Sequence, residues 1–329
     1  MAKHPAPKRR TRVEDRPAHE IPAGPRTNLY REITDRIIGE LEAGRVPWVQ
    51  PWGRPGGAGI GLPRNASTGR AYSGINILLL WGAVAQAGYA GQSWLTFRQA
   101  LGLGGSVRKG ERGTTVVYAD RFTPEDERRR AKLDGDAPRG IPFLKRFTVF
   151  NTEQCEGLPE DSASNASPSP ECLVLPRVEQ LIRASGADLR IGGDRACYDL
   201  RSDLIRVPPP QAFHEPIDWH RTALHELGHW SGAASRLGRD LSGTFGSKRY
   251  AQEELVAEMT AAFACAALAI VPTVRHADYM GSWLEVLRED DRAIVRAASA
   301  ASKAADLLLS FAPEAESPAG SAAVQEVAR

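Results

Sequence analysis

The stretch "TALHELGHW", residues 222–230, contains two histidines four positions apart, with a glutamate directly after the first. In an α-helix, positions i and i+4 share one face, so His225 and His229 can direct both imidazoles at one cation while Glu226 lies close to it. Two imidazoles are an incomplete zinc shell, since a catalytic zinc usually takes three protein ligands and keeps one position for water. The spacing therefore predicts a site for Zn²⁺, or for another divalent ion such as Mn²⁺, and requires a third ligand.

The acidic stretch "EELVAE", residues 253–258, offers that ligand on a predicted helix further along the chain. Glu254 and Glu258 are one turn apart, so Glu254 can bind the metal while Glu258 accepts a hydrogen bond from a ligand histidine. Glu253 points about 100° away from Glu254 in an ideal helix, which makes it the weaker choice for the third ligand.

These residue types are those of a zinc-dependent peptidase. A bound zinc polarises both a water molecule and the scissile carbonyl, and Glu226 then takes the proton of the water and passes it to the leaving amine. The oxyanion-stabilising residue stays open among Tyr250, Tyr279 and Tyr198. His214, His220 and His276 are expected to be surface or packing residues. The alternative is a metal that is structural or regulatory, with no hydrolysis.

Charge divides unevenly along the 329 residues. Residues 27–157 hold eighteen Lys/Arg against thirteen Asp/Glu, whereas residues 158–329 hold seventeen against twenty-four. A basic front and an acidic back are expected if a polyanion binds the first half. The chain shows no apolar run of membrane-spanning length and no secretory signal, so we expect a cytoplasmic protein with no membrane contact.

Tryptophans and arginines alternate in the front half, around "PWVQPWGRP". Aromatic faces beside basic side chains suit unpaired bases, which predicts single-stranded DNA as a partner. Trp48 and Trp52 are equally compatible with a core position, and Trp81, within an apolar run, is expected in the core. "LGLGGSVRKGERG" lacks the lysine of a phosphate loop and is interpreted as a turn that offers its basic residues to a phosphate backbone. The DNA-binding candidates are Trp48, Trp52, Arg54, Arg64, Arg70, Arg108, Lys109 and Arg112.

Periodicity predicts the α+β class. Helices are expected in "TNLYREITDRIIGELEAG", "INILLLWGAVAQAG", "WLTFRQALGLG", "RVEQLIRASG", the two metal-site segments and about 277–311. "TTVVYADRF" and "FLKRFTVFNTEQ" are predicted strands around a charged insertion, and "RACYDLRSDLIRVPPP" is a predicted strand pair.

Composition divides the chain into two domains. We expect a disordered basic arm at 1–26, an α+β single-stranded DNA-binding domain at 27–156 and a Ser/Pro-rich linker at 157–172. A mainly helical, zincin-like metallopeptidase domain with a small sheet is expected at 173–311, followed by a disordered tail at 312–329.

Four segments of the front half resemble the N-terminal domain of ArdC-type antirestriction proteins, which TraC-type plasmid primases share: "TNLYREITDRIIGELEAGRVPWVQPW", "RNASTGRAYSGINILLLW", "WLTFRQALGLGGSVRKGERGTTVVY" and "RFTVFNTEQCEGLP". "LHELGHWSG", "RLGRDLSGTFGS" and "YAQEELVAEMTAAFACAALAI" resemble the zincin-like metallopeptidase domain that follows it in that family. The resemblance covers about residues 27–272.

The resemblance implies a protein of conjugative plasmids and other mobile elements that binds single-stranded DNA and protects incoming DNA from host restriction. It assigns metal ligands to His225, His229 and Glu254 and the catalytic role to Glu226. A host restriction protein or another protein would be the peptidase substrate. The alternative is a non-enzymatic DNA-binding protector. A primase is disfavoured, because the chain has no carboxylate cluster with a zinc ribbon.

Overall fold

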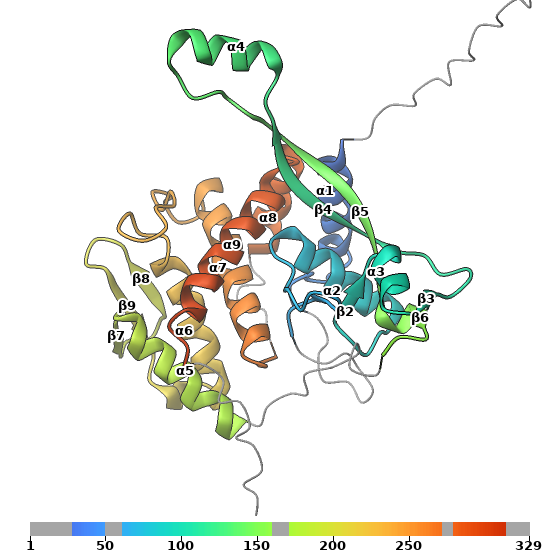
Figure 1. The fold of residues 1–329 in the computed structure, drawn as a ribbon. Coiled ribbons are helices and arrows are strands. Elements are labelled where there is room, and N and C mark those ends of the chain that lie inside the picture. The colour runs from blue at the N-terminus through green and yellow to red at the C-terminus, as the bar shows by residue number, and fades with distance from the viewer. Residues whose placement is uncertain (1–27, 50–60, 160–170, 272–278, 314–329) are drawn as a thin grey trace, which may run out of the picture.

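The computed structural model describes residues 28–49, 61–159, 171–271 and 279–313, and it confirms the α+β class (Figure 1). The helices are α1 (Leu29–Glu42), α2 (Ile75–Ala87), α3 (Phe97–Gly102), α4 (Glu125–Asp134), α5 (Glu171–Ser185), α6 (Pro216–Trp230), α7 (Lys248–Ala267), α8 (Met280–Glu289) and α9 (Ala293–Leu309). The strands are β1 (Arg64–Asn65), β2 (Ser93–Leu95), β3 (Ser106–Val107), β4 (Thr114–Phe122), β5 (Ile141–Asn151), β6 (Cys155–Glu156), β7 (Asp188–Ile191), β8 (Cys197–Asp199) and β9 (Leu204–Val207). Short 3₁₀ turns lie at Thr152–Gln154 and Pro210–Ala212. No helix within these ranges is long and apolar enough to cross a membrane.

A four-stranded sheet organises the first half, in the order β1-β2-β5-β4. β4 pairs with β5 in antiparallel fashion over the whole length of β4, from Thr114 opposite Val149 to Phe122 opposite Ile141. They form a long ribbon that leaves the body and carries α4 at its tip (Figure 1). The two predicted strands are therefore confirmed.

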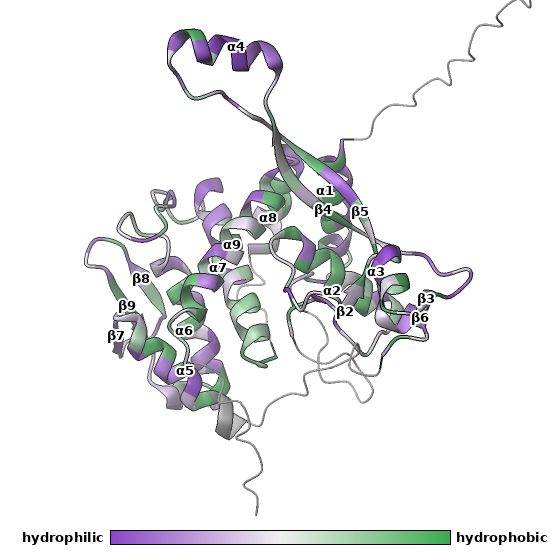
Figure 2. Cartoon of the chain, viewed as in Figure 1, coloured by the Kyte–Doolittle hydropathy of each residue, from purple (hydrophilic) through white to green (hydrophobic). Residues whose placement is uncertain are grey.

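The charged insertion between these strands contains a helix, α4, which the sequence did not predict because the segment has no apolar periodicity. α4 has acidic residues in its first turn and Lys132 in its last, which suits the helix dipole, and Arg130 pairs with Glu127. The helix is hydrophilic on nearly all sides (Figure 2). It shows no apolar stripe, and Ala131 is its buried residue.

A small sheet in the order β7-β9-β8 lies beside α5 and α6 in the second half. β8 and β9 are the predicted strand pair and are antiparallel. β7, which the sequence did not predict, lies parallel to β9. Its four residues alternate polar and apolar, but four are too few to stand out as a period, and only Leu189 among them is even half-buried.

α7 lies at the centre and belongs to both large hydrophobic clusters. One cluster joins α1 and α2 to α7, α8 and α9, and includes Ile37, Met259 and Ile294. The other joins α5, β9 and α6 to the opposite side of α7, and includes Leu181 and Leu224. The two halves of the sequence therefore share a core, while their boundary at 157–172 remains a prediction.

Trp48 is part of this core. Its side chain is 0% exposed and packs edge-on against Trp283, with 5.3 Å between ring centroids. No ring face is left for a nucleotide base, so the predicted DNA contact of Trp48 is wrong. The physical reason is that burying an indole against a second indole stabilises the shared core. Trp81, expected in the core, is also 0% exposed.

Candidate metal centre

The metal centre forms where α6 packs against α7, and a glycine makes that contact possible. Gly228 lies between the two histidines of α6, and a Cβ added there would be 3.2 Å from Cα of Ala257 on α7. A larger residue would separate the helices, whereas glycine lets the backbones approach closely. This close approach places the acidic side chains of α7 beside the histidines.

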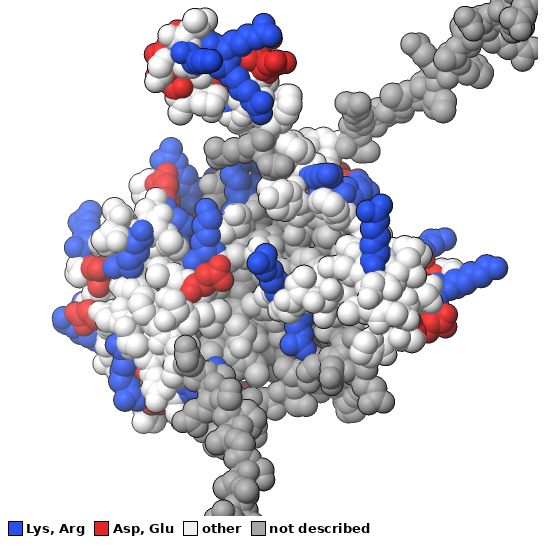
Figure 3. Space-filling view, in the orientation of Figure 1, with Lys and Arg blue, Asp and Glu red and all other residues white. Residues whose placement is uncertain are grey.

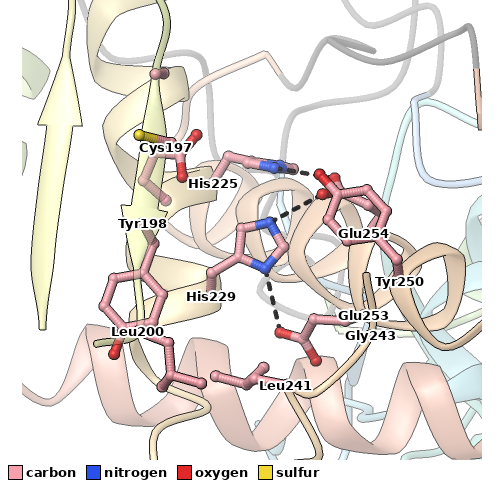
Figure 4. Close-up of a pocket in the computed structure, with 12 residues that line it drawn as sticks. Cys197, Tyr198, Leu200, His225, His229, Leu241, Gly243, Tyr250, Glu253 and Glu254 are labelled. Carbon is pink, nitrogen blue, oxygen red and sulfur yellow. Dashed lines mark hydrogen bonds and ion pairs between the residues drawn. The ribbon is translucent and has the colours of Figure 1, made fainter. Parts of the chain in front are cut away.

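His225, His229 and Glu254 come together as predicted, each offering one ligand atom. The three atoms lie within 4.8 Å of one another. Nε2 of His225 is 3.5 Å from Oε2 of Glu254, and Nε2 of His229 is 3.5 Å from Oε1 of the same carboxylate (Figure 4). Both histidines thus present the same ring nitrogen to the place that a cation would occupy.

Each histidine also has a carboxylate behind it. Nδ1 of His225 lies 3.7 Å from Oε1 of Glu258, the residue predicted for this role. Nδ1 of His229 donates to Oε1 of Glu253 at 3.3 Å, a contact that the sequence did not predict. Such partners fix the ring orientation and increase the basicity of the ligand nitrogen.

Arg239, in the loop between α6 and α7, holds Glu253 in place. It donates to both oxygens of Glu253 at 2.6 and 3.0 Å, and to the carbonyl oxygen of Gly228 at 2.6 Å. It also donates to Oγ of Ser231 at 2.9 Å. Arg239 therefore connects the end of α6 to α7, and sequence reasoning missed it. The sequence did contain an indication of this contact: Nδ1 of His229 needs a hydrogen-bond acceptor just as Nδ1 of His225 does.

Proton affinities at the site reflect this packing of opposite charges. Burial by itself would lower the pKa of His229, but Glu253 and Glu254 outweigh burial and raise it to about 10. Burial would raise the pKa of Glu254, but His225 and His229 outweigh it and hold the pKa well below its usual value. Without a metal, the cluster therefore holds a proton where a cation would bind.

Glu226 faces a pocket of about 240 Å³ that the three metal-site residues also line. The side chain of Glu226 is buried, and Cys197 and Tyr198 of β8, an edge strand, also line the pocket (Figure 4). Leu200 and Leu241 add an apolar part to the wall. One pocket is thus lined both by Glu226, the predicted base, and by the three predicted metal ligands.

The three tyrosines proposed for the oxyanion differ in position. Tyr250 of α7 lines the pocket next to Glu254, and burial, followed by Glu254 and Tyr279, raises the pKa of its hydroxyl. Tyr198 lines the pocket too, but its hydroxyl donates to Asp203 at 2.8 Å and accepts from Arg236 at 3.1 Å. The hydroxyl of Tyr279 donates to the hydroxyl of Tyr250 at 3.4 Å, and Tyr279 is not among the residues that line the pocket. Tyr250 is therefore the best placed.

The remaining histidines lie away from this centre. His220 is buried, with Nδ1 bonded to the carbonyl oxygen of Pro216 at 3.0 Å, and His214 is exposed on the surface. Both positions agree with the expected packing and surface roles. His276 lies outside the described residues.

The described basic residues predicted to bind DNA come from two segments, 64–70 and 108–112. Arg70, Arg108, Lys109 and Arg112 are exposed, and Arg64 is half-buried with its Nε 3.5 Å from Oγ of Ser93. Arg112 lines a groove between α1, α2 and the start of β4, together with Arg36 and Tyr89. Trp52 and Arg54 lie outside the described residues.

Two families match successive parts of the chain. Residues 27–150 match the N-terminal domain of anti-restriction factor ArdC, and residues 176–300 match a zincin-like metallopeptidase family. The "Uncharacterized protein y4eC" of Sinorhizobium fredii is 40% identical over 292 residues, which cover 85% of this chain and 91% of that protein. The "DNA primase TraC" of Escherichia coli is 40% identical over 296 residues, 86% of this chain but only 27% of the primase.

Solved structures show the same relationship. The metal-free crystal structure of the antirestriction protein ArdC from the R388 plasmid superposes with a TM-score of 0.72 at 40% identity, covering 86% of this chain and 97% of that one. Its Mn(II)-bound structure gives 0.71 at 39% identity, covering 87% and 99%. The chain therefore belongs to the ArdC family of antirestriction proteins, with an ArdC-type N-terminal domain followed by a zincin-like metallopeptidase domain.

Proposed function

We propose that this protein protects the DNA of a mobile element from restriction in a new host, by binding the DNA as a single strand and by hydrolysing a peptide bond at the metal centre. One observation carries the proposal. A chain with an ArdC-type N-terminal domain also brings His225, His229 and Glu254 within 4.8 Å of one another, beside Glu226, in an open pocket.

The donor set fits a divalent metal. Two imidazole nitrogens and one carboxylate, with one side open to the pocket, are the ligands of catalytic zinc sites, and the same set also accepts Mn²⁺. The Mn(II)-bound structure of the ArdC relative supports a divalent ion. We propose Zn²⁺ as the natural ion.

The chemistry follows from the positions of the side chains. When bound, the ion would supply a Lewis acid that polarises a water molecule and the scissile carbonyl. Glu226 would take up the proton of that water and pass it to the leaving amine, and Tyr250 would donate a hydrogen bond to the oxyanion. The edge strand β8 beside the pocket supports an extended peptide of a host restriction protein, or of another protein, as substrate.

The proposal is tested by transferring plasmid DNA into a restricting host that contains wild-type protein, Glu226→Gln or His225→Ala. Wild type should protect the DNA and neither variant should, because Glu226→Gln removes the base and His225→Ala removes the ion. Glu226→Gln must retain its metal for the comparison to hold. Full protection by Glu226→Gln would instead support a non-enzymatic protector with a structural or regulatory metal.

A further inference from the structure

One face of the β4–β5 ribbon carries four aromatic side chains. In an antiparallel pair, opposite residues point to the same side, and residues two apart on a strand share a face. Tyr118 is opposite Lys145, and Val116 is opposite Phe147. The register therefore places Tyr118 and Phe122 of β4 on the same face as Phe143, Lys145 and Phe147 of β5.

These rings are exposed. The exposed fraction is 59% for Tyr118 and for Phe122, 38% for Phe143 and 41% for Phe147. On the other face, Val117 is buried in the core and Leu144 packs against it. On the aromatic face only the end nearest the body is buried, where Val116 and Val149 pack with Leu80 and Trp94. Four exposed aromatic rings on one face exceed what folding requires and indicate a binding surface.

The charge around these rings is positive. Nζ of Lys145 lies 5.3 Å from the centroid of the Phe147 ring. Arg146, the next residue, is exposed on the other face of the ribbon, where it pairs with Glu32 of α1. Arg98 is exposed on the neighbouring α3. Figure 3 shows Lys and Arg side chains over the surface formed by β5 and α3. The two strands carry three basic residues, Arg121, Lys145 and Arg146, against one acidic residue, Asp120, which is opposite Phe143 in the register.

We propose that this aromatic face, formed by Tyr118, Phe122, Phe143, Lys145 and Phe147, is the surface on which the bases of single-stranded DNA stack. Side chains two residues apart on a strand are about 7 Å apart, so successive rings can receive successive bases of an extended strand. Unpaired bases offer the ring faces that duplex DNA conceals, and Lys145 can neutralise a phosphate. This inference rests on the proposed single-strand binding and assigns it a site.

The test measures fluorescence anisotropy of a labelled oligothymidine with the full chain. The double variant Tyr118→Ala, Phe143→Ala should bind about tenfold or more weakly, because two stacking faces are lost. The double variant Tyr118→Phe, Phe143→Tyr keeps both rings and should bind like wild type. Phe245→Ala is the matched control, since it removes a ring that is 81% exposed in the other half of the molecule. Thermal melts of all variants should coincide, because the changed side chains are exposed.

Salt dependence adds a second readout. Lys145→Ala should reduce the slope of log affinity against log salt by about 0.7, the value for one phosphate contact on a single strand, whereas the double alanine variant should leave the slope unchanged. Wild-type affinity in the double alanine variant would overturn the aromatic face as the site, as would an equal loss in Phe245→Ala, and single-strand binding itself would stand. Absence of binding by wild type would overturn the proposed function together with this inference.

Discussion

At the scale of residues, the two ligand histidines are supported by two different carboxylates. Glu258 lies behind His225, and Glu253 lies behind His229 with Arg239 holding it. The ligands themselves and Glu258 follow from helical spacing in the sequence. Glu253 and Arg239 do not, because which side of α7 faces His229 depends on how α6 and α7 cross.

Glu253→Gln should weaken metal binding by about ten- to a hundredfold, since Nδ1 of His229 loses a charged acceptor and Arg239 loses its partner. Competition with a chromophoric zinc chelator measures the change. Gln252→Ala is the matched control, because Gln252 precedes Glu253 on α7 but is exposed. Equal affinities of wild type and Glu253→Gln would mean that Glu253 does not support the ligand.

Metal binding should release a proton and strengthen as pH rises. The pKa of His229, raised from 6.5 to about 10, leaves this residue protonated at neutral pH in the metal-free protein, and a ligand imidazole must be neutral. The stability of the metal-free fold changes with pH in the opposite direction to the affinity for metal. The stability that the protonated His229 contributes to the metal-free fold is complete below pH 6.5 and is lost as pH rises to about 10.

Isothermal titration calorimetry of zinc in two buffers of different ionisation enthalpy measures this release. The apparent enthalpy should differ between buffers by the amount for about one proton per ion at neutral pH. Identical enthalpies in both buffers would show that His229 is already neutral.

At the scale of elements, the site depends on how closely α6 approaches α7. Gly228→Ala would place a methyl group 3.2 Å from Cα of Ala257 and 3.4 Å from its carbonyl oxygen, and backbone atoms cannot swing aside as a flexible side chain can. We expect a loss of about 1–3 kcal/mol in the free energy of unfolding, with weaker metal binding.

Gly39→Ala on α1 is the control, because nothing lies within 4 Å of the added methyl group. It should stabilise the protein by about 0.5–1 kcal/mol through helix propensity. Urea denaturation measures both variants. If Gly228→Ala were as stable as Gly39→Ala and bound zinc as tightly as wild type, the close approach would not matter.

The sequence predicts elements well where one face is buried and poorly where contacts between distant segments decide. α1, β4 and β5 have clear periodicity and were expected. β7 was missed because it is largely exposed, and α4 was missed because it packs on little. The sequence around Trp48 is compatible both with stacking on a nucleotide base and with a core position. Its contact with Trp283, which is distant in the sequence, places it in the core.

At the scale of the whole molecule, the two predicted domains share one hydrophobic cluster across α1, α2, α7, α8 and α9. Trp283→Ala removes a fully buried ring that contacts Trp48, so it should cost about 3–5 kcal/mol. Differential scanning calorimetry should show a single transition that moves to lower temperature as a whole. Two transitions, of which only one moves, would indicate that the halves unfold independently.

Everything proposed for the metal centre depends on one divalent ion bound by His225, His229 and Glu254, with Glu226 left free as a base. The direct measurement is metal content by plasma mass spectrometry after zinc loading and gel filtration. Wild type and Glu226→Gln should retain one ion per chain, and His225→Ala and Glu254→Ala should retain none. A wild-type protein without metal, or a His225→Ala variant that keeps its ion, would contradict this assignment.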